Sequence, residues 1–208
     1  GHVSIIFSLL IYDPGASIPF LGRIQMSHRS FNYPTTLSSR NCLTYSLPQV
    51  TVFWLVAPIG VIQGVYAKYY ALSLTTLAGI ILFARIFDAV TDPLVGFYSD
   101  RYYQRFGTRK PFMLVGGLLL IVSSYLLYVP QSIGVAYFIG CFVIFYAAYT
   151  LFEIPHNAWG TELATQSKDK SLIYTCRSVA NYMGLTLFYV VPLLPIFESN
   201  EITPETLK

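Results

Sequence analysis

The hydrophobic residues of this chain are gathered into long runs that short polar stretches separate. Five runs are long enough for a helix to cross roughly 30 Å of hydrocarbon at about 1.5 Å per residue. They cover approximately residues 48–68, 75–98, 112–129, 133–157 and 171–196. Backbone polar groups in lipid must be satisfied within their own segment, which favours helices. The pattern therefore predicts an all-α integral membrane protein with five transmembrane helices.

The regions outside these runs divide the chain further. Residues 1–43 show no sustained period and are expected to form a poorly specified N-terminal tail. Residues 44–196 are the predicted transmembrane bundle, and residues 197–208 are expected to begin an extracytoplasmic loop. The chain starts at Gly1 rather than at a methionine, and five is an odd number of spans. We therefore expect a fragment, with a sixth helix following.

Composition agrees with a lipid environment. Hydrophobic residues make up 54% of the chain, charged residues only 11%, and the mean hydropathy is +0.55, whereas soluble domains carry about 25% charged residues. Cys42, Cys141 and Cys176 are far apart and lack CxxC spacing, so we expect separate thiols in the membrane core. No HExxH or GxSxG nucleophile pattern is present in the sequence, and nothing favours nucleic-acid binding. An enzyme is not expected.

The placement of Lys and Arg predicts the orientation. If the helices alternate in direction, nine of the 13 basic residues fall on one side. These nine are Arg23, Arg29, Arg40, Arg101, Arg105, Arg109, Lys110, Lys168 and Lys170. Basic residues favour the cytoplasmic side of short loops. We therefore expect a multi-pass protein of the cell membrane with a cytoplasmic N-terminus.

Five ionisable residues interrupt the apolar runs. They are Arg85, Asp88, Asp92, Glu153 and Arg177. Each costs at least about 2.5 kcal/mol at the bilayer centre, so such residues usually face a partner or a cavity and mark function.

The spacing of these charges suggests a cation site. Asp88 and Asp92 are four residues apart, which places both carboxylates on one helix face, and Arg85 shares that face. Three acids against two arginines leave one negative charge, and neighbouring buried carboxylates need a cation or a proton. A purely structural alternative pairs Arg85 with Asp88 within one helix and Glu153 with Arg177 between helices.

Two segments of the chain resemble a known family. Residues 83–113 contain the pattern R-x-x-D-A-x-x-D-P, formed by Arg85, Asp88, Ala89, Asp92 and Pro93. Residues 149–184 contain an aromatic-Thr-x-x-acid-Ile-Pro motif followed by an arginine. Both resemble the glycoside–pentoside–hexuronide:cation symporters, which are melibiose-carrier-like members of the major facilitator superfamily. The resemblance covers roughly residues 44–196 and implies a partial N-terminal bundle of that fold.

The resemblance implies secondary active transport by alternating access. Asp88 and Asp92 would hold Na⁺ or H⁺ with Thr150 as an added oxygen ligand, and Glu153 and Arg177 would bind a carbohydrate. The coupling ion is then the only cofactor, and the partners are the bilayer, the substrate and the missing C-terminal half. A superfamily loop motif that helps to close the cytoplasmic side corresponds to Gly96, Asp100, Arg101, Gly107, Arg109 and Lys110.

Two departures from the family keep other substrates open. Melibiose-type carriers have a sugar-contacting acid in the first helix, but residues 50–55 contain none. Glu153 also replaces the usual aspartate. Relatives of this family move lysophospholipids, so the same fold carrying a non-sugar amphiphile remains an alternative. A non-transporting membrane sensor or scaffold is a second one, and a truncated chain is not expected to transport by itself.

Overall fold

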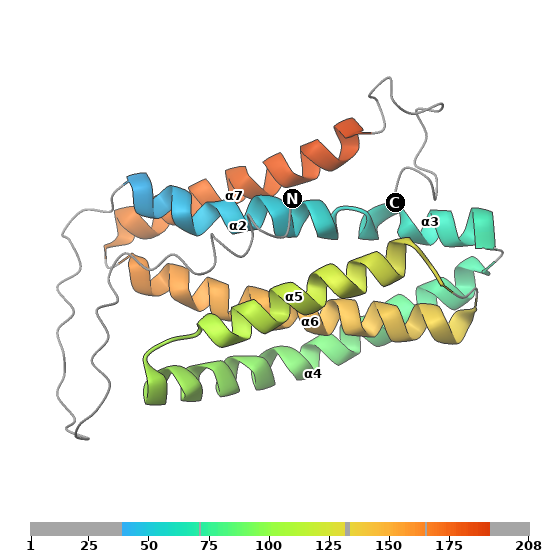
Figure 1. The fold of residues 1–208 in the computed structure, drawn as a ribbon, viewed down its shortest axis with the longest axis horizontal. Helices are drawn as coiled ribbons and strands as arrows, with labels where there is room; N and C mark the ends of the chain where they lie inside the picture. Colours follow the sequence, from blue (N-terminus) through green and yellow to red (C-terminus); the bar gives the residue numbers. More distant parts are fainter. Residues whose placement is uncertain (1–38, 71, 132–133, 165, 192–208) are drawn as a thin grey trace.

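The described part of the chain is a bundle of long helices (Figure 1). The computed structural model describes residues 39–191, except residues 71, 132–133 and 165. Within those residues every regular element is helical: α2 (Ser39–Val56), α3 (Ile59–Tyr70), α4 (Leu74–Phe106), α5 (Lys110–Tyr128), α6 (Val135–Leu163) and α7 (Ser167–Val190). The expected all-α fold is confirmed.

The helices alternate in direction and form two layers. In Figure 1, α2, α3 and α7 lie in one layer, and α4, α5 and α6 lie in the other. α5 and α4 both pack along α6, and α2 packs along α7. This alternation brings the start of α2, the end of α4 and the start of α7 to one end of the bundle (Figure 1). The basic residues that the structure describes at those positions therefore share one end, as the sequence predicted.

The first predicted span differs from the observed helices. The structure has two helices, α2 and α3, where a single helix over residues 48–68 was expected. Pro58 explains the break, because proline lacks an N–H group and its ring clashes with the carbonyl group four residues earlier. The chain continues in nearly the same direction (Figure 1), so the two helices form one candidate span, Arg40–Tyr70. Residues 39–43, which were assigned to the tail, belong to α2.

The second span extends beyond its predicted end. α4 contains 33 residues and continues from residue 98 to Phe106, so the expected loop residues Arg101 and Arg105 are helical. Charged residues alone do not end a helix, but Gly107 does, because it adopts φ 71° in the left-handed region and its N–H bonds to the Tyr103 carbonyl. At the other end, Ser73 accepts a hydrogen bond from the Thr76 amide over 3.1 Å.

Within the described residues, four helical segments are long and apolar enough to cross a membrane. They are Arg40–Tyr70, Leu74–Phe106, Lys110–Tyr128 and Val135–Leu163. α7 has 24 residues, which is sufficient length for a fifth span, but its sequence is more polar. Its predicted range was 171–196, of which residues 192–196 lie outside the described residues, as do the whole of 197–208 and residues 1–38.

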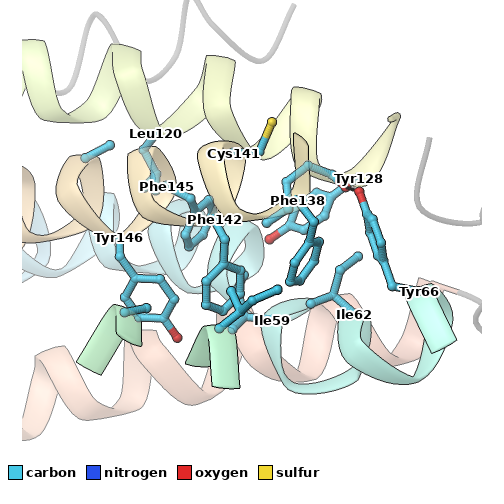
Figure 2. Close-up of a cluster of buried hydrophobic side chains, with 14 of the residues drawn as sticks. Ile59, Ile62, Tyr66, Leu120, Tyr128, Phe138, Cys141, Phe142, Phe145 and Tyr146 are labelled. Atoms are coloured by element: carbon cyan, nitrogen blue, oxygen red, sulfur yellow. Dashed lines mark hydrogen bonds between the residues drawn. The ribbon is translucent and has the colours of Figure 1, made fainter. Parts of the chain in front are cut away.

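Aromatic side chains dominate the core at the end of the bundle opposite the basic residues (Figure 2). Phe138 and Phe142 of α6 stack with centroids 5.2 Å apart, and Tyr66 of α3 lies 4.4 Å from Phe138. Two tyrosines of this core donate to backbone carbonyl groups: Tyr66 donates to the Leu127 carbonyl over 2.8 Å, and Tyr128 donates to the Leu55 carbonyl. Both hydroxyls are therefore satisfied without water.

Small residues allow two helix pairs to approach closely. A Cβ atom at Gly184 of α7 would overlap the Val50 carbonyl of α2, and one at Gly116 of α5 would lie 2.6 Å from the Phe152 nitrogen of α6. Small residues at such positions are how membrane helices pack without a hydrophobic driving force between them. These contacts bring α2 and α7, and α5 and α6, close enough for side chains to interact.

The cysteines differ from the sequence prediction. Cys42 and Cys176 are joined as a disulfide between α2 and α7, with Cα atoms 6.4 Å apart, and Cys141 is a buried free thiol. The expectation of three separate thiols was wrong, because a separation of 134 residues carries no information about helices that pack side by side. The pairing places these two helix ends in direct contact.

Candidate functional site

The acidic pair of α4 faces α6. Thr150 Oγ1 of α6 donates a hydrogen bond to Asp92 Oδ1 over 3.0 Å. Arg85 Nη1 lies 3.6 Å from Asp88 Oδ2, although the Arg85 side chain is 64% exposed. Asp88 Oδ1 is buried and has no hydrogen-bond partner among the described residues. The structure therefore joins Asp92 to Thr150, and Asp88 lies one turn before Asp92 on α4.

This arrangement supplies oxygen ligands. Two carboxylates and a hydroxyl oxygen suit hard cations such as Na⁺, whereas thiolate and imidazole ligands suit transition metals. Among the residues that the structure describes, no group of three or more His, Cys, Asp and Glu side chains could hold a metal ion. The orphaned Asp88 oxygen fits an additional positively charged ligand, because a buried carboxylate oxygen without a partner is costly.

A second polar cluster joins α6, α7 and α2. Arg177 of α7 donates to Glu153 Oε1 of α6, and these side chains are only 15% and 11% exposed. Gln49 Nε2 of α2 donates to the other carboxylate oxygen, Oε2, over 3.0 Å. Asn157 Nδ2 donates to Oε1 over 3.4 Å. Glu153 is therefore the common acceptor for three side chains.

Gln49 and His156 were not selected from the sequence. Both side chains are 0% exposed. His156 Nε2 lies 3.0 Å from the Tyr45 carbonyl oxygen, which only accepts, so Nε2 carries the proton and Nδ1 accepts from Gln49 Nε2 over 3.5 Å. The Tyr45 ring stacks on the imidazole with centroids 4.3 Å apart. The available signal for Gln49 was an amide side chain in the apolar span 48–68.

The two clusters locate the surplus negative charge. Glu153 is compensated by Arg177, and Asp88 is paired with Arg85, whose side chain is largely exposed. Asp92 accepts a hydrogen bond from the Thr150 hydroxyl and forms no ion pair within the described part of the chain. The excess charge inferred from the sequence therefore belongs to the α4 pair. Thr150 and Glu153 lie three residues apart on α6, so that helix contributes to both clusters.

A third cluster lies at the basic end of the bundle. Arg109 Nη2 contacts Asp100 Oδ1 of α4 over 2.9 Å and Glu162 Oε1 of α6 over 3.0 Å. Its guanidinium also lies over the Tyr103 ring, 4.3 Å from the centroid. Gly107 provides the left-handed turn that returns the chain toward α4. This network ties the α4–α5 connection to the end of α6, and Glu162 was missed because nothing near it in sequence indicates a partner.

Other residues of the predicted loop motif lie outside this network. Arg101 is exposed on α4 and Lys110 begins α5. Gly96 lies against α6, where an added Cβ would approach Ile154 Cγ2 to 3.8 Å. The described contacts join Asp100 to Arg109, and the turn at Gly107 lies between these two residues.

Known proteins resemble this chain over the same region. It is 29% identical over 133 residues to an uncharacterized symporter, YjmB, of Bacillus subtilis, covering 60% of this chain and 29% of that protein. It is 27% identical to the sodium-dependent lysophosphatidylcholine symporter 1 of Gallus gallus, and the match covers 62% of this chain and 26% of that protein. It is 26% identical to a putative glycoside/cation symporter, YagG, of Escherichia coli, and the match covers 54% of this chain and 25% of that protein.

The chain thus spans between a quarter and a third of the length of these relatives. No solved structure matches it. All three relatives are named symporters, which agrees with transport as the general activity. The sequence profile described as MFS/sugar transport protein matches residues 45–207, nearly the whole predicted membrane region. The chain belongs to this family of major facilitator superfamily transporters.

Proposed function

We propose that this chain forms the N-terminal part of a carrier that couples the entry of Na⁺ or H⁺ to uptake of a sugar or glycoside. The observation that carries the proposal is the acidic pair on α4 beside Thr150, one helical turn along α6 from the Glu153–Arg177 pair. Two distinct polar clusters on one shared helix are what a symporter needs, because it must bind two different solutes. The complete carrier requires the remaining half of the fold.

Asp88 and Asp92 are the proposed cation ligands. A bound cation would compensate their surplus negative charge and fill the free Asp88 oxygen. Thr150 retains lone pairs on its hydroxyl oxygen while it donates to Asp92, so it serves as an additional ligand. A proton on either carboxylate would meet the same electrostatic requirement.

Glu153 and Arg177 are the proposed substrate ligands. A carboxylate accepts hydrogen bonds and a guanidinium donates them, so together they match paired hydroxyl groups. Because α6 contributes both Thr150 and Glu153, a change in its position caused by one solute alters the site of the other. This shared helix is the proposed physical basis of coupling.

A lysophospholipid is the second candidate substrate. It is favoured by the similarity to a sodium-dependent lysophosphatidylcholine symporter and by the absence of an acid in residues 50–55. The proposed cation site is the same in both cases. The two candidates therefore differ only in what contacts Glu153 and Arg177.

The proposed location is the cell membrane, with the basic end of the bundle in the cytoplasm. The described residues at that end include Arg101, Arg105, Lys168 and Lys170, whereas Lys68 lies at the opposite end of α3. The Arg109 network would then help to close the cytoplasmic side in one state of the transport cycle. Asp100 and Arg109 of the predicted motif, with Glu162, provide ion-pairing groups for this role.

The first prediction concerns the cation. In the full-length protein, sodium chloride at about ten times the dissociation constant should stabilise the wild type by about 1.4 kcal/mol relative to choline chloride. Asp88→Asn and Asp92→Asn should lose this gain, because each removes a charged ligand. Thermal unfolding in detergent measures it, and Asp169→Asn in the first turn of α7 is the matched control. If H⁺ rather than Na⁺ is the coupling ion, the difference in stability should appear between buffers of low and high pH. The absence of stabilisation by either ion would contradict the proposal.

The second prediction concerns the substrate. Arg177→Lys keeps the charge but loses the planar fork, so affinity should fall roughly tenfold or more, since bonds to charged groups are worth about 1.5–3 kcal/mol. The measurement is the binding of nitrophenyl glycosides and of lysophosphatidylcholine to the full-length wild type and to Arg177→Lys. Stabilisation by sodium ions should persist, and Arg105→Lys at the exposed end of α4 is the control. Binding of the lysolipid alone would identify the second candidate.

The third prediction concerns orientation. A cysteine introduced at Gln104 should react with a membrane-impermeant maleimide only after intact cells are permeabilised. A cysteine at Tyr69, beside Lys68, should react before permeabilisation, because it lies at the opposite end of the bundle. The reverse pattern would place the basic end outside.

The fourth prediction concerns the Arg109 network. Arg109→Ala leaves Asp100 and Glu162 without their shared cation, so the unfolding temperature should fall more than in Arg105→Ala. Combining Arg109→Ala with Glu162→Gln should be less harmful than the sum of the single changes, with a coupling energy of about 1 kcal/mol. Additive effects in the double-mutant cycle would show that the contact contributes nothing.

A further inference from the structure

Gln49 is a polar side chain in a place where polarity is costly. It lies on α2 within the candidate span Arg40–Tyr70 and is 0% exposed. An amide buried in an apolar environment without hydrogen bonds costs several kcal/mol on the cyclohexane scale. Half of this amide is satisfied, since Nε2 donates to Glu153 and approaches His156 Nδ1. The other half, Oε1, is buried and has no partner among the described residues.

Glu153 determines the orientation of this amide. Paired with Arg177, the carboxylate only accepts hydrogen bonds, so the NH₂ group of Gln49 must face it. The same reasoning applies to Asn157, whose Nδ2 faces Glu153 from 3.4 Å. Each amide oxygen is thereby directed away from the carboxylate that it neighbours.

Unused hydrogen-bonding groups accumulate around the Glu153–Arg177 pair. The oxygens of Gln49 and Asn157 are buried and unpartnered in the described structure, and so is Oδ1 of Asn181, one turn beyond Arg177 on α7. Arg177 Nε is an unused donor of the same cluster. Buried polar groups in native proteins are nearly always paired, so a set of free acceptors beside a candidate binding site indicates a ligand that donates hydrogen bonds.

We propose that Gln49 is a specificity-determining residue of the Glu153–Arg177 site, where its amide oxygen accepts a hydrogen bond from a substrate hydroxyl group. The inference rests on the proposed function, because it requires that site to bind substrate. As a neutral acceptor, Gln49 leaves the Glu153–Arg177 pair electrically balanced.

The free acceptors also discriminate between the two candidate substrates. A sugar presents several O–H donors. Lysophosphatidylcholine presents one, the free hydroxyl of its glycerol, because its quaternary ammonium carries no N–H and its phosphodiester only accepts. A site with unpaired acceptors rejects a ligand that cannot satisfy them, since the buried polar groups then remain unpaired. The free oxygens of Gln49, Asn157 and Asn181 together therefore favour a substrate with several hydroxyl groups.

The test uses the full-length protein and a panel of nitrophenyl glycosides with their monodeoxy analogues. Gln49→Leu removes the acceptor and should weaken binding of the parent glycoside roughly tenfold. For the one deoxy analogue that lacks the contacted hydroxyl, wild type and Gln49→Leu should bind equally. A structural role alone would weaken all analogues by the same factor. Gln63→Leu in α3 makes the same chemical change outside the cluster and should bind every analogue like the wild type.

A second variant protects the test against misfolding of Gln49→Leu. Asn181→Ala removes another free acceptor without breaking any described hydrogen bond, and it should weaken a different member of the panel. If both variants lose binding affinity by the same factor for every member of the panel, the inference is overturned, and the proposed function still stands. If the wild type binds no glycoside but binds lysophosphatidylcholine, the sugar assignment fails, and this inference fails with it.

Discussion

The ion pair between Glu153 and Arg177 is the constraint on which the polar interior of this bundle depends. A single charge buried among apolar helices is far more costly than a paired one, so neither residue can be buried without the other. Their contact joins α7 to α6 at a point where these helices otherwise share few contacts. It also fixes Gln49, because the carboxylate draws the amide nitrogen toward itself. One pair thus links three helices.

α6 is central to the rest of the architecture. α4 and α5 pack along it, and its aromatic face fills the core at the end away from the basic residues (Figures 1 and 2). Its other half presents Thr150 toward Asp92 and Glu153 toward Arg177. The helix therefore combines an apolar packing surface with polar groups on successive turns. That division places the candidate ion and substrate sites side by side without either disturbing the packed core.

The charges in the apolar segments could be found from the sequence, but their pairing could not be assigned. Spacing placed Asp88 and Asp92 on one face, since residues four apart always share a helix face. It could not choose between the structural pairs and an ion site. The structure contains both structural pairs, Arg85 with Asp88 and Glu153 with Arg177, and it leaves one oxygen of Asp88 without a partner among the described residues. Gln49 was missed because its partner lies 104 residues away.

The sequence by itself determined the helical spans, because apolar length and the need to satisfy backbone groups in lipid are local properties. It also located Asp88 and Asp92. Only the tertiary structure decided where the first span breaks at Pro58, that α4 continues to Phe106, and that Cys42 meets Cys176. Helix ends depend on single turn residues such as Gly107, and contacts between helices depend on which faces pack together. Neither is encoded in the hydrophobic pattern of one segment.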